Sequence, residues 1–282
     1  MSINRQLTGS EKRAAAVIGT TLSVIVFFST ILHHIFPWVL KVQPCTGVPY
    51  TGYIDMFLLD LIPIAMGAVC FYHAARTMGL YKTMMFLGGV FFFSGLVENA
   101  WILLGRNHLL GLISAQLKDV TGTYFFTRGF FWWGEMPAAI CVGWFFITYA
   151  CVYMLDVLAP KANIWFRAAM AGLLAMDFDL WLDPVQVHPA WQSWTWVSNE
   201  TIKILSIPFS NFAGWFLFVF LFSLAFDRLQ RITDRWGAGK GAWLFFLLLL
   251  GLKLCLVGTL MICGGAAMRY VSPPVNLTIW GI

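Results

Sequence analysis

Three aspartates at the end of one apolar segment are the residues of this chain best suited to chemistry. Asp179 and Asp183 are four positions apart and would share one face of a helix, whereas Asp177 would lie roughly on the opposite face. Two carboxyl groups side by side in apolar surroundings repel each other when both are ionised, so one is expected to hold a proton and act as a general acid. The alternative is structural: Asp183, before Pro184, caps a turn, and Asp179 pairs with a basic side chain.

Other polar residues lie within or beside apolar segments. Glu98 has no basic neighbour in the sequence, and an intramembrane glutamate either takes part in function or fixes packing through a hydrogen bond to another helix. Glu135 precedes Pro137 at the expected start of a helix, where a carboxylate can cap the helix or act chemically. Asp60 is expected about one turn into another segment. Asn211 could bind a water or an acid, or cap the helix that follows it.

The sequence lacks most signatures of cofactor chemistry. The five histidines show no HxxH or HExxH spacing and the six cysteines no CxxC spacing, so no metal site is indicated. No glycine-rich nucleotide loop and no GxSxG motif is present. Lys253 lies deep in the last apolar segment, as a retinal-binding lysine would, but the third-helix acid and arginine pattern of microbial rhodopsins is missing. An ion pair or a snorkelling side chain is the ordinary explanation for such a lysine. We expect no cofactor.

The composition identifies a membrane protein. Of the 282 residues 60% are hydrophobic and 11% charged, against about a quarter charged in soluble domains. The Lys and Arg residues form no basic run, which argues against nucleic-acid binding. Seven segments are long enough to cross a bilayer as helices. They lie near 13–37, 55–78, 83–104, 135–158, 163–182, 210–232 and 242–267. The expected fold is therefore all-α: a single integral membrane domain, 1–282, of about seven transmembrane helices.

The positive-inside rule predicts the orientation of these helices. With the N-terminus cytoplasmic, eleven Lys and Arg residues fall on the inner side and six on the outer side. This predicts an N-in, C-out protein of the cell inner membrane. In that orientation Glu98, Asp179 and Asp183 lie near the outer side, together with the two longest connections, 105–134 and 183–209. The acids and the aromatic connections are thus expected to meet at one end of the bundle.

Two blocks of residues resemble the seven-span carotenoid-biosynthesis membrane family that includes the bisanhydrobacterioruberin and γ-carotene hydratases. The resemblance covers roughly 95–220. The first block consists of Glu98, Gly122, Tyr124, Pro137 and Trp144. The second consists of Asp179, Asp183, Pro184, Trp194, Trp196, Pro208, Asn211, Phe212, Gly214 and Trp215.

The resemblance implies addition of water to a terminal isoprenoid double bond of a carotenoid or related polyene, without a cofactor. A protonated carboxyl group would protonate the alkene, and water would capture the tertiary cation. Glu98, Asp179, Asp183 and Asn211 would be catalytic, with Asp177, Glu135 and Asp60 as secondary candidates. Substrate-binding aromatic residues would be Tyr124, Trp144, Trp194, Trp196, Phe212 and Trp215.

Two other functions fit the same residues. A membrane terpenoid or lycopene-type cyclase would begin with the same protonation, but an internal double bond would quench the cation. A non-catalytic pigment- or lipid-binding subunit would use the aromatic residues as a greasy surface, as an interfacial belt does, and the acids to pair with a partner. In each case the partners would be a lipophilic polyene and the lipid bilayer, and the sequence does not predict an oligomeric state.

Overall fold

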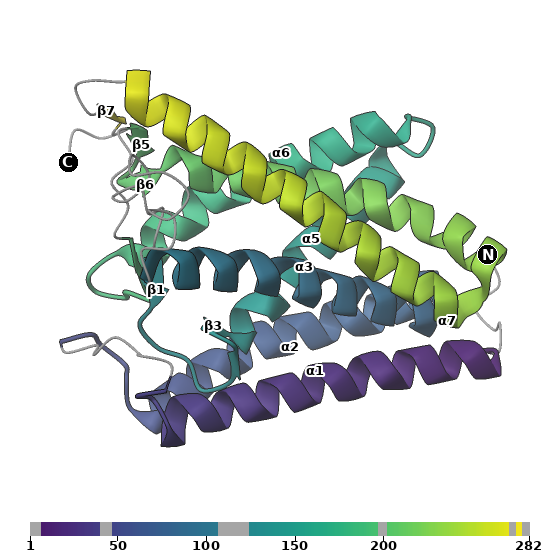
Figure 1. Ribbon diagram of the computed structural model, residues 1–282, viewed down its shortest axis with the longest axis horizontal. Coiled ribbons are helices and arrows are strands. Elements are labelled where there is room, and N and C mark those ends of the chain that lie inside the picture. The colour runs from purple at the N-terminus through teal and green to yellow at the C-terminus, as the bar shows by residue number, and fades with distance from the viewer. Residues whose placement is uncertain (1–6, 40–46, 107–123, 197–201, 271–274, 278–282) are drawn as a thin grey trace.

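Helices account for most of the protein. The computed structural model describes residues 7–39, 47–106, 124–196, 202–270 and 275–277, and 78% of these residues are helical. Six helices lie within these residues (Figure 1). They are α1 (Gly9–Ile35), α2 (Tyr53–Met78), α3 (Leu80–Arg106), α5 (Ala138–Leu158), α6 (Ile164–Val187) and α7 (Phe209–Tyr270). The predicted α-helical fold is confirmed.

Helix α7 joins two of the predicted segments, 210–232 and 242–267. Gly237 has φ 76° and ψ 165°, which interrupts the helical backbone of α7. A positive φ of this size strains residues that carry a Cβ, so glycine suits this position. The half of α7 before Gly237 runs away from the strands, and the half after Gly237 returns toward them (Figure 1). The break predicted between 232 and 242 is therefore a sharp turn at one glycine.

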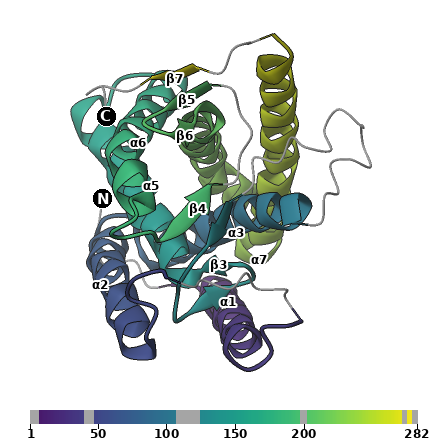
Figure 2. The ribbon, with the colours of Figure 1, turned by 90° about the vertical axis from the view of Figure 1, so that its left-hand side faces the viewer.

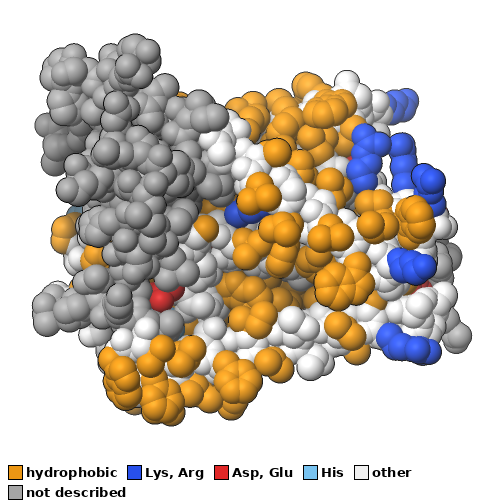
Figure 3. Space-filling view, viewed as in Figure 1, with side chains coloured by type: hydrophobic (Ala, Val, Ile, Leu, Met, Phe, Trp, Pro, Cys, Tyr) orange, Lys and Arg blue, Asp and Glu red, His pale blue; other side chains and the backbone are white. Residues whose placement is uncertain are grey.

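Within the described residues, five helices are long and apolar enough to cross a membrane: α1, α2, α3, α5 and α7. Helix α6 is not among them, and it carries Arg167 together with Asp177, Asp179 and Asp183. Seven crossings and the N-in, C-out orientation remain predictions. On the face shown in Figure 3, hydrophobic side chains cover the middle, and Lys and Arg side chains gather at the end opposite the strands.

Short strands connect the helices at one end of the bundle (Figures 1 and 2). β1 (Tyr124–Phe126) pairs antiparallel with β4 (Trp194–Trp196), and so joins the two long connections. β2 (Trp132–Trp133) and β3 (Met136–Pro137) form a hairpin. β5 (Ile202–Ile204) lies between β6 (Ile207–Pro208) and β7 (Val275–Leu277). The prediction that both long connections lie at the same end of the bundle is confirmed.

The hairpin changes the expected start of one helix. The sequence predicts a helix from 135, but Trp133 pairs with Met136, and α5 begins at Ala138 after Pro137. Glu135 therefore lies in the β2–β3 turn, where its backbone N–H donates to Asn99 Oδ1 at 2.5 Å. The expectation that Glu135 begins the helix is wrong, because strand pairing holds the residues on both sides of it.

The core consists largely of aromatic side chains contributed by α3, α5 and α7. Phe222 of α7 is fully buried and contacts the rings of Phe86 and Phe93 from α3. It also contacts Phe245 on the returning half of the same helix. Fully burying one such side chain is worth roughly 1.5–3 kcal/mol in water. Inside a lipid bilayer, close packing of this kind holds helices together instead.

Candidate acid site

Asp179 and Asp183 lie on the buried face of α6 and are held by one amide of α7. Asn211 Nδ2 donates to Asp179 Oδ2 at 2.6 Å and to Asp183 Oδ2 at 2.8 Å. The exposed fraction of the two aspartates is 0% and 2%. Their spacing of four residues places both carboxyl groups toward α7, as the sequence predicts. Asn211 uses both of its amide hydrogens on them and so positions the pair.

The third acid reaches the same region from α3. Glu98 is 8% exposed, and its Oε1 accepts a hydrogen bond of 3.2 Å from Trp144 Nε1 of α5. Asp179 and Asp183 both lie within range of electrostatic interaction with Glu98. We call Glu98, Asp179 and Asp183 the acid cluster. Residues from separate helices form it, as expected if the acids meet at one end of the bundle.

An aromatic wall lies beside the acid cluster. The ring of Trp144 stacks on that of Trp215 from α7, with centroids 3.8 Å apart and planes 25° apart. Phe218, one turn further along α7, lies 4.2 Å from the Trp144 ring. Because Trp144 also donates to Glu98, the edge of this stack touches the acid cluster while its faces remain apolar. Such π faces stabilise positive charge.

Lys253 is the residue that the sequence reasoning did not connect to this site. It is 3% exposed, and its Nζ donates to the carbonyl oxygen of Phe93 at 2.6 Å and lies 5.0 Å from the centre of the Phe93 ring. Its charge interacts with that of Glu98. The sequence gives only a general indication of this contact: a single lysine and a single glutamate in apolar segments each need a partner. No spacing links positions 98 and 253.

The pair of aspartates has an unsatisfied oxygen. Among the described residues no donor lies within hydrogen-bond distance of Asp179 Oδ1, although the atom is buried. The neighbouring carboxyl group of Asp183 interacts directly with Asp179. Two carboxyl groups at such close range are best accommodated by sharing one proton. The arrangement can therefore deliver a proton to a bound molecule.

Three predicted aromatic residues lie in the strand layer instead. The rings of Tyr124 and Trp196 are 4.6 Å apart, and those of Phe126 and Trp194 are 5.9 Å apart. They pack in a second buried cluster that covers the strand end of the bundle. Phe212 is buried beside Asn211 at the start of α7. Gly122, part of the resemblance, lies outside the described residues.

Two secondary candidates have other surroundings. Asp177 is exposed, on the face of α6 opposite Asp179, as the helical spacing predicts. Asp60 is buried in α2, where its Oδ2 accepts hydrogen bonds from the backbone N–H groups of Phe130 and Phe131 at 3.0 and 2.9 Å. Asp60 thus holds the loop that precedes β2. Across the described part of the chain, no three His, Cys, Asp or Glu side chains are arranged to hold a metal ion.

The bond between Trp144 and Glu98 can be tested with a conservative change. In Trp144→Phe an aromatic face still covers Trp215, but Glu98 loses its indole donor. A buried charged group that loses a hydrogen-bond partner costs about 1–3 kcal/mol, so the free energy of unfolding in detergent should fall by about that amount. Trp215→Phe keeps the stack and the Glu98 hydrogen bond and is the matched control. Equal losses in the two variants would mean that the hydrogen bond contributes nothing beyond packing.

Comparison with known protein families gives a match to more than half of the chain. The family described as carotenoid biosynthesis protein matches residues 122–277, which is more than half of the 282 residues. The matched region contains Asp179, Asp183, Asn211 and Lys253, whereas Glu98 precedes it. The matched region begins at residue 122, whereas the resemblance described under Sequence analysis begins near residue 95. The match also extends through the returning half of α7. No curated protein and no solved structure matches this chain. The chain belongs to the carotenoid biosynthesis protein family.

Proposed function

We propose that this protein is a hydratase that adds water to a terminal isoprenoid double bond of a carotenoid or a related polyene. The observation that supports this most is the buried pair of Asp179 and Asp183, bridged by Asn211, with Glu98 and the Trp144–Trp215 stack beside it. The family supports a role in carotenoid biosynthesis. The reaction needs an acid, a base and a surface that tolerates a carbocation. The acid cluster supplies the acid and the base, and the Trp144–Trp215 stack supplies the surface.

Protonation is the first step. The proton shared by Asp179 and Asp183 is transferred to the less substituted carbon of the terminal double bond, and a tertiary cation forms on the neighbouring carbon. A positioned general acid contributes roughly 10²–10⁴-fold to such a step. Asn211 keeps the two carboxyl groups together, and after the transfer its amide stabilises the charge that remains on them.

The cation is then stabilised and captured. The faces of Trp144 and Trp215 offer π density to the positive carbon, an interaction worth about 2 kcal/mol or more when water is excluded. A water molecule attacks the cation, and Glu98 accepts the proton that this water releases. The new C–O bond yields a tertiary alcohol. Proton return from Glu98 to the aspartates resets the acid cluster, so the net change is the addition of one water.

The setting of the reaction follows from the same proposal. The chain would form a single membrane domain with seven crossings, the two halves of α7 counting separately. The N-terminus would be cytoplasmic, in the cell inner membrane. The acid cluster lies in the half of the bundle that carries the strands, so it would face the outer leaflet. The polyene would remain in lipid while only its end reaches the acids.

A product assay tests the proposal. The protein is expressed in a bacterium that accumulates lycopene, and the pigments are separated by chromatography and mass spectrometry. A hydratase yields a product heavier than lycopene by one water. An isomer of unchanged mass would instead identify a cyclase, in which an internal double bond quenches the cation. Unchanged lycopene, with the pigment bound to the purified protein, would identify a pigment-binding subunit.

A further inference from the structure

A groove on the side of the bundle leads from the outer surface of the helices to the Trp144–Trp215 stack. It has a volume of about 320 Å³ and lies between α2, α5 and α6. This volume is within the range of small-molecule sites, roughly 300–1,000 Å³. Trp144 and Trp215 line the groove, and Trp144 donates to Glu98. A molecule in the groove would therefore touch a side chain that is hydrogen-bonded to the acid cluster.

The groove opens toward the surface that lipid would cover. Only 11% of the most apolar stretch of α2 lies buried inside the protein. The rim carries exposed apolar side chains, Ile62 and Met66 of α2 and Phe178 of α6. Phe178 and Leu182 precede the two buried aspartates, so α6 presents its acids to the interior and these apolar side chains to the groove. A hydrocarbon chain could enter sideways without leaving the bilayer.

The few polar side chains that line the groove are engaged within the protein. Asp60 accepts from two backbone N–H groups, and Gln186 Oε1 accepts from Trp191 Nε1 and Ser193 Oγ at 2.8 and 2.6 Å. Arg128 donates to the Pro49 carbonyl oxygen and to Ser193 Oγ, and its guanidinium lies 4.8 Å from the centre of the Trp191 ring. A ligand in the groove therefore needs no charged or hydrogen-bonding groups to satisfy these side chains.

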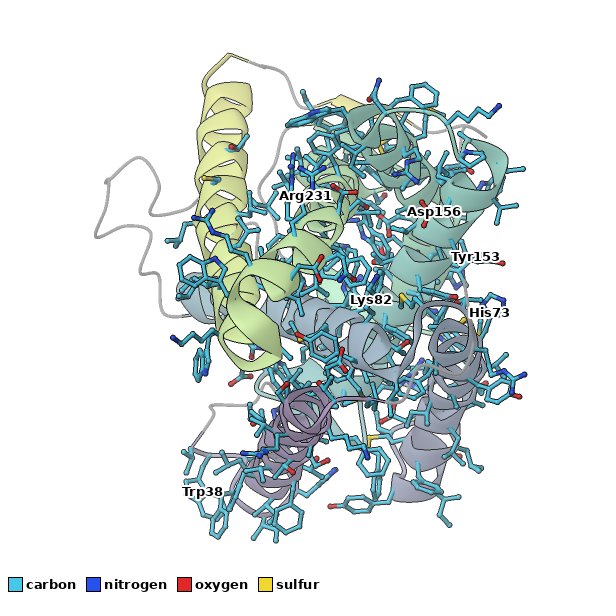
Figure 4. All side chains as sticks on the ribbon, turned by 90° about the vertical axis from the view of Figure 1, so that its right-hand side faces the viewer. Trp38, His73, Lys82, Tyr153, Asp156 and Arg231 are labelled. Carbon is cyan, nitrogen blue, oxygen red and sulfur yellow. The ribbon has the colours of Figure 1, made fainter. Side chains whose placement is uncertain are left out.

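A second cavity has a different character. It has a volume of about 860 Å³ and lies at the end of the bundle opposite the strands. Charged and hydroxylated side chains line it, among them Lys82, Tyr153 and Asp156, which Figure 4 shows at that end. It does not include any member of the acid cluster. An uncharged hydrocarbon therefore suits the groove between α2, α5 and α6 and not this second cavity.

We propose that the groove between α2, α5 and α6 binds the end of a linear, uncharged isoprenoid hydrocarbon and admits it from the bilayer to the acid cluster. The identity of this ligand as substrate rests on the proposed function. The groove holds only the terminal part of a long polyene, and the rest of the chain lies in lipid.

Gly143 of α5 allows a direct test. It lines the groove, and no atom lies within 4 Å of the position its Cβ would take. A side chain added at this position would therefore begin in open space and extend into the groove. Gly251 of α7 is also helical and has equally open space, but it is exposed and lies outside the groove. Gly251→Phe is the matched control for the added bulk.

The experiment measures the lycopene that remains bound to each purified full-length variant from lycopene-accumulating cells, by absorbance per protein. Gly143→Phe should bind less than wild type by about ten-fold or more, Gly143→Ala should bind nearly as much, and Gly251→Phe should be unchanged. Monodisperse elution and an unaltered thermal transition establish that Gly143→Phe is folded. Wild-type binding by folded Gly143→Phe would overturn the proposal. Displacement of lycopene by phosphatidylglycerol vesicles, but not by squalene, would also overturn it, since the groove would then take a charged lipid.

Binding and turnover distinguish this proposal from the proposed function. If lycopene binds and Gly143→Phe abolishes the binding, while no hydrated product forms, then the groove is correct and the hydratase assignment is wrong. If product forms equally well in wild type and in folded Gly143→Phe, then the hydratase assignment stands and the groove is not the route to the acids.

Discussion

Asp183→Asn should reduce formation of the hydrated product by roughly 10²–10⁴-fold, the usual contribution of a general acid. Asparagine has nearly the same shape and can still accept from Asn211, so the packing of α6 against α7 should persist. The substitution removes the possibility of a proton shared with Asp179. Asp179→Asn should have an effect of similar size, because each residue holds half of the pair. Product per folded protein, from the lycopene assay, is the quantity to measure.

Asp177→Asn is the control for this pair. It makes the same chemical change on the same helix, but the side chain is exposed on the opposite face. Surface substitutions of this kind usually change stability by no more than about 0.5 kcal/mol, and product formation should stay near the wild-type level. If Asp179→Asn and Asp183→Asn each form product at the wild-type rate, then the aspartate pair does not act as the proton donor.

Lys253→Met should destabilise the protein by about 1–3 kcal/mol, because the buried Phe93 carbonyl oxygen loses its donor and Glu98 loses a nearby positive charge. Methionine approximates the length of the lysine side chain, so the loss reports mainly on charge. Lys253 interacts with Glu98 and donates to the carbonyl oxygen of Phe93. Unfolding in detergent measures the change. Lys240→Met, at an exposed position near Gly237, should change the stability little.

The double variant separates charge from packing. If Lys253 acts by balancing the charge of Glu98, then Lys253→Met in a Glu98→Gln background should cost much less than in the wild type. The stability of the double variant should recover most of the loss, but product formation should not return, because Glu98 is the proposed base. If the double variant instead loses as much stability as the two single variants together, then Lys253 and Glu98 are energetically independent.

Hydrophobicity predicted most of the fold because helix formation in lipid is a local requirement. Each apolar segment must satisfy its own backbone, so a segment such as α2 can be located within a few residues from its composition. The turn at Gly237 falls in the interval between the predicted segments 210–232 and 242–267. The strands could not be predicted in this way: β1 and β4 are three residues each and come from distant parts of the chain. Their pairing depends on tertiary structure.

The site was partly predictable for a similar reason. Asp179 and Asp183 share a helical face at a fixed spacing, so one segment is enough to pair them. The bridge from Asn211 joins two helices, and the sequence offered it only as one of several roles for that residue. The interaction between Glu98 and Lys253 depends on how α3 packs against the returning half of α7. No local pattern encodes that packing, so the sequence does not link the two residues.

The most direct test of the acid mechanism is the origin of the atoms added to the polyene. Purified protein in lipid nanodiscs is incubated with lycopene in deuterium oxide enriched in a heavy oxygen isotope, and the product is examined by mass spectrometry and NMR. The mechanism predicts one deuterium on the carbon next to a tertiary alcohol and the heavy isotope in its hydroxyl group. Asp183→Asn should incorporate both roughly 10²–10⁴-fold more slowly. A product without the heavy oxygen, or one without oxygen at all, would contradict acid-initiated hydration.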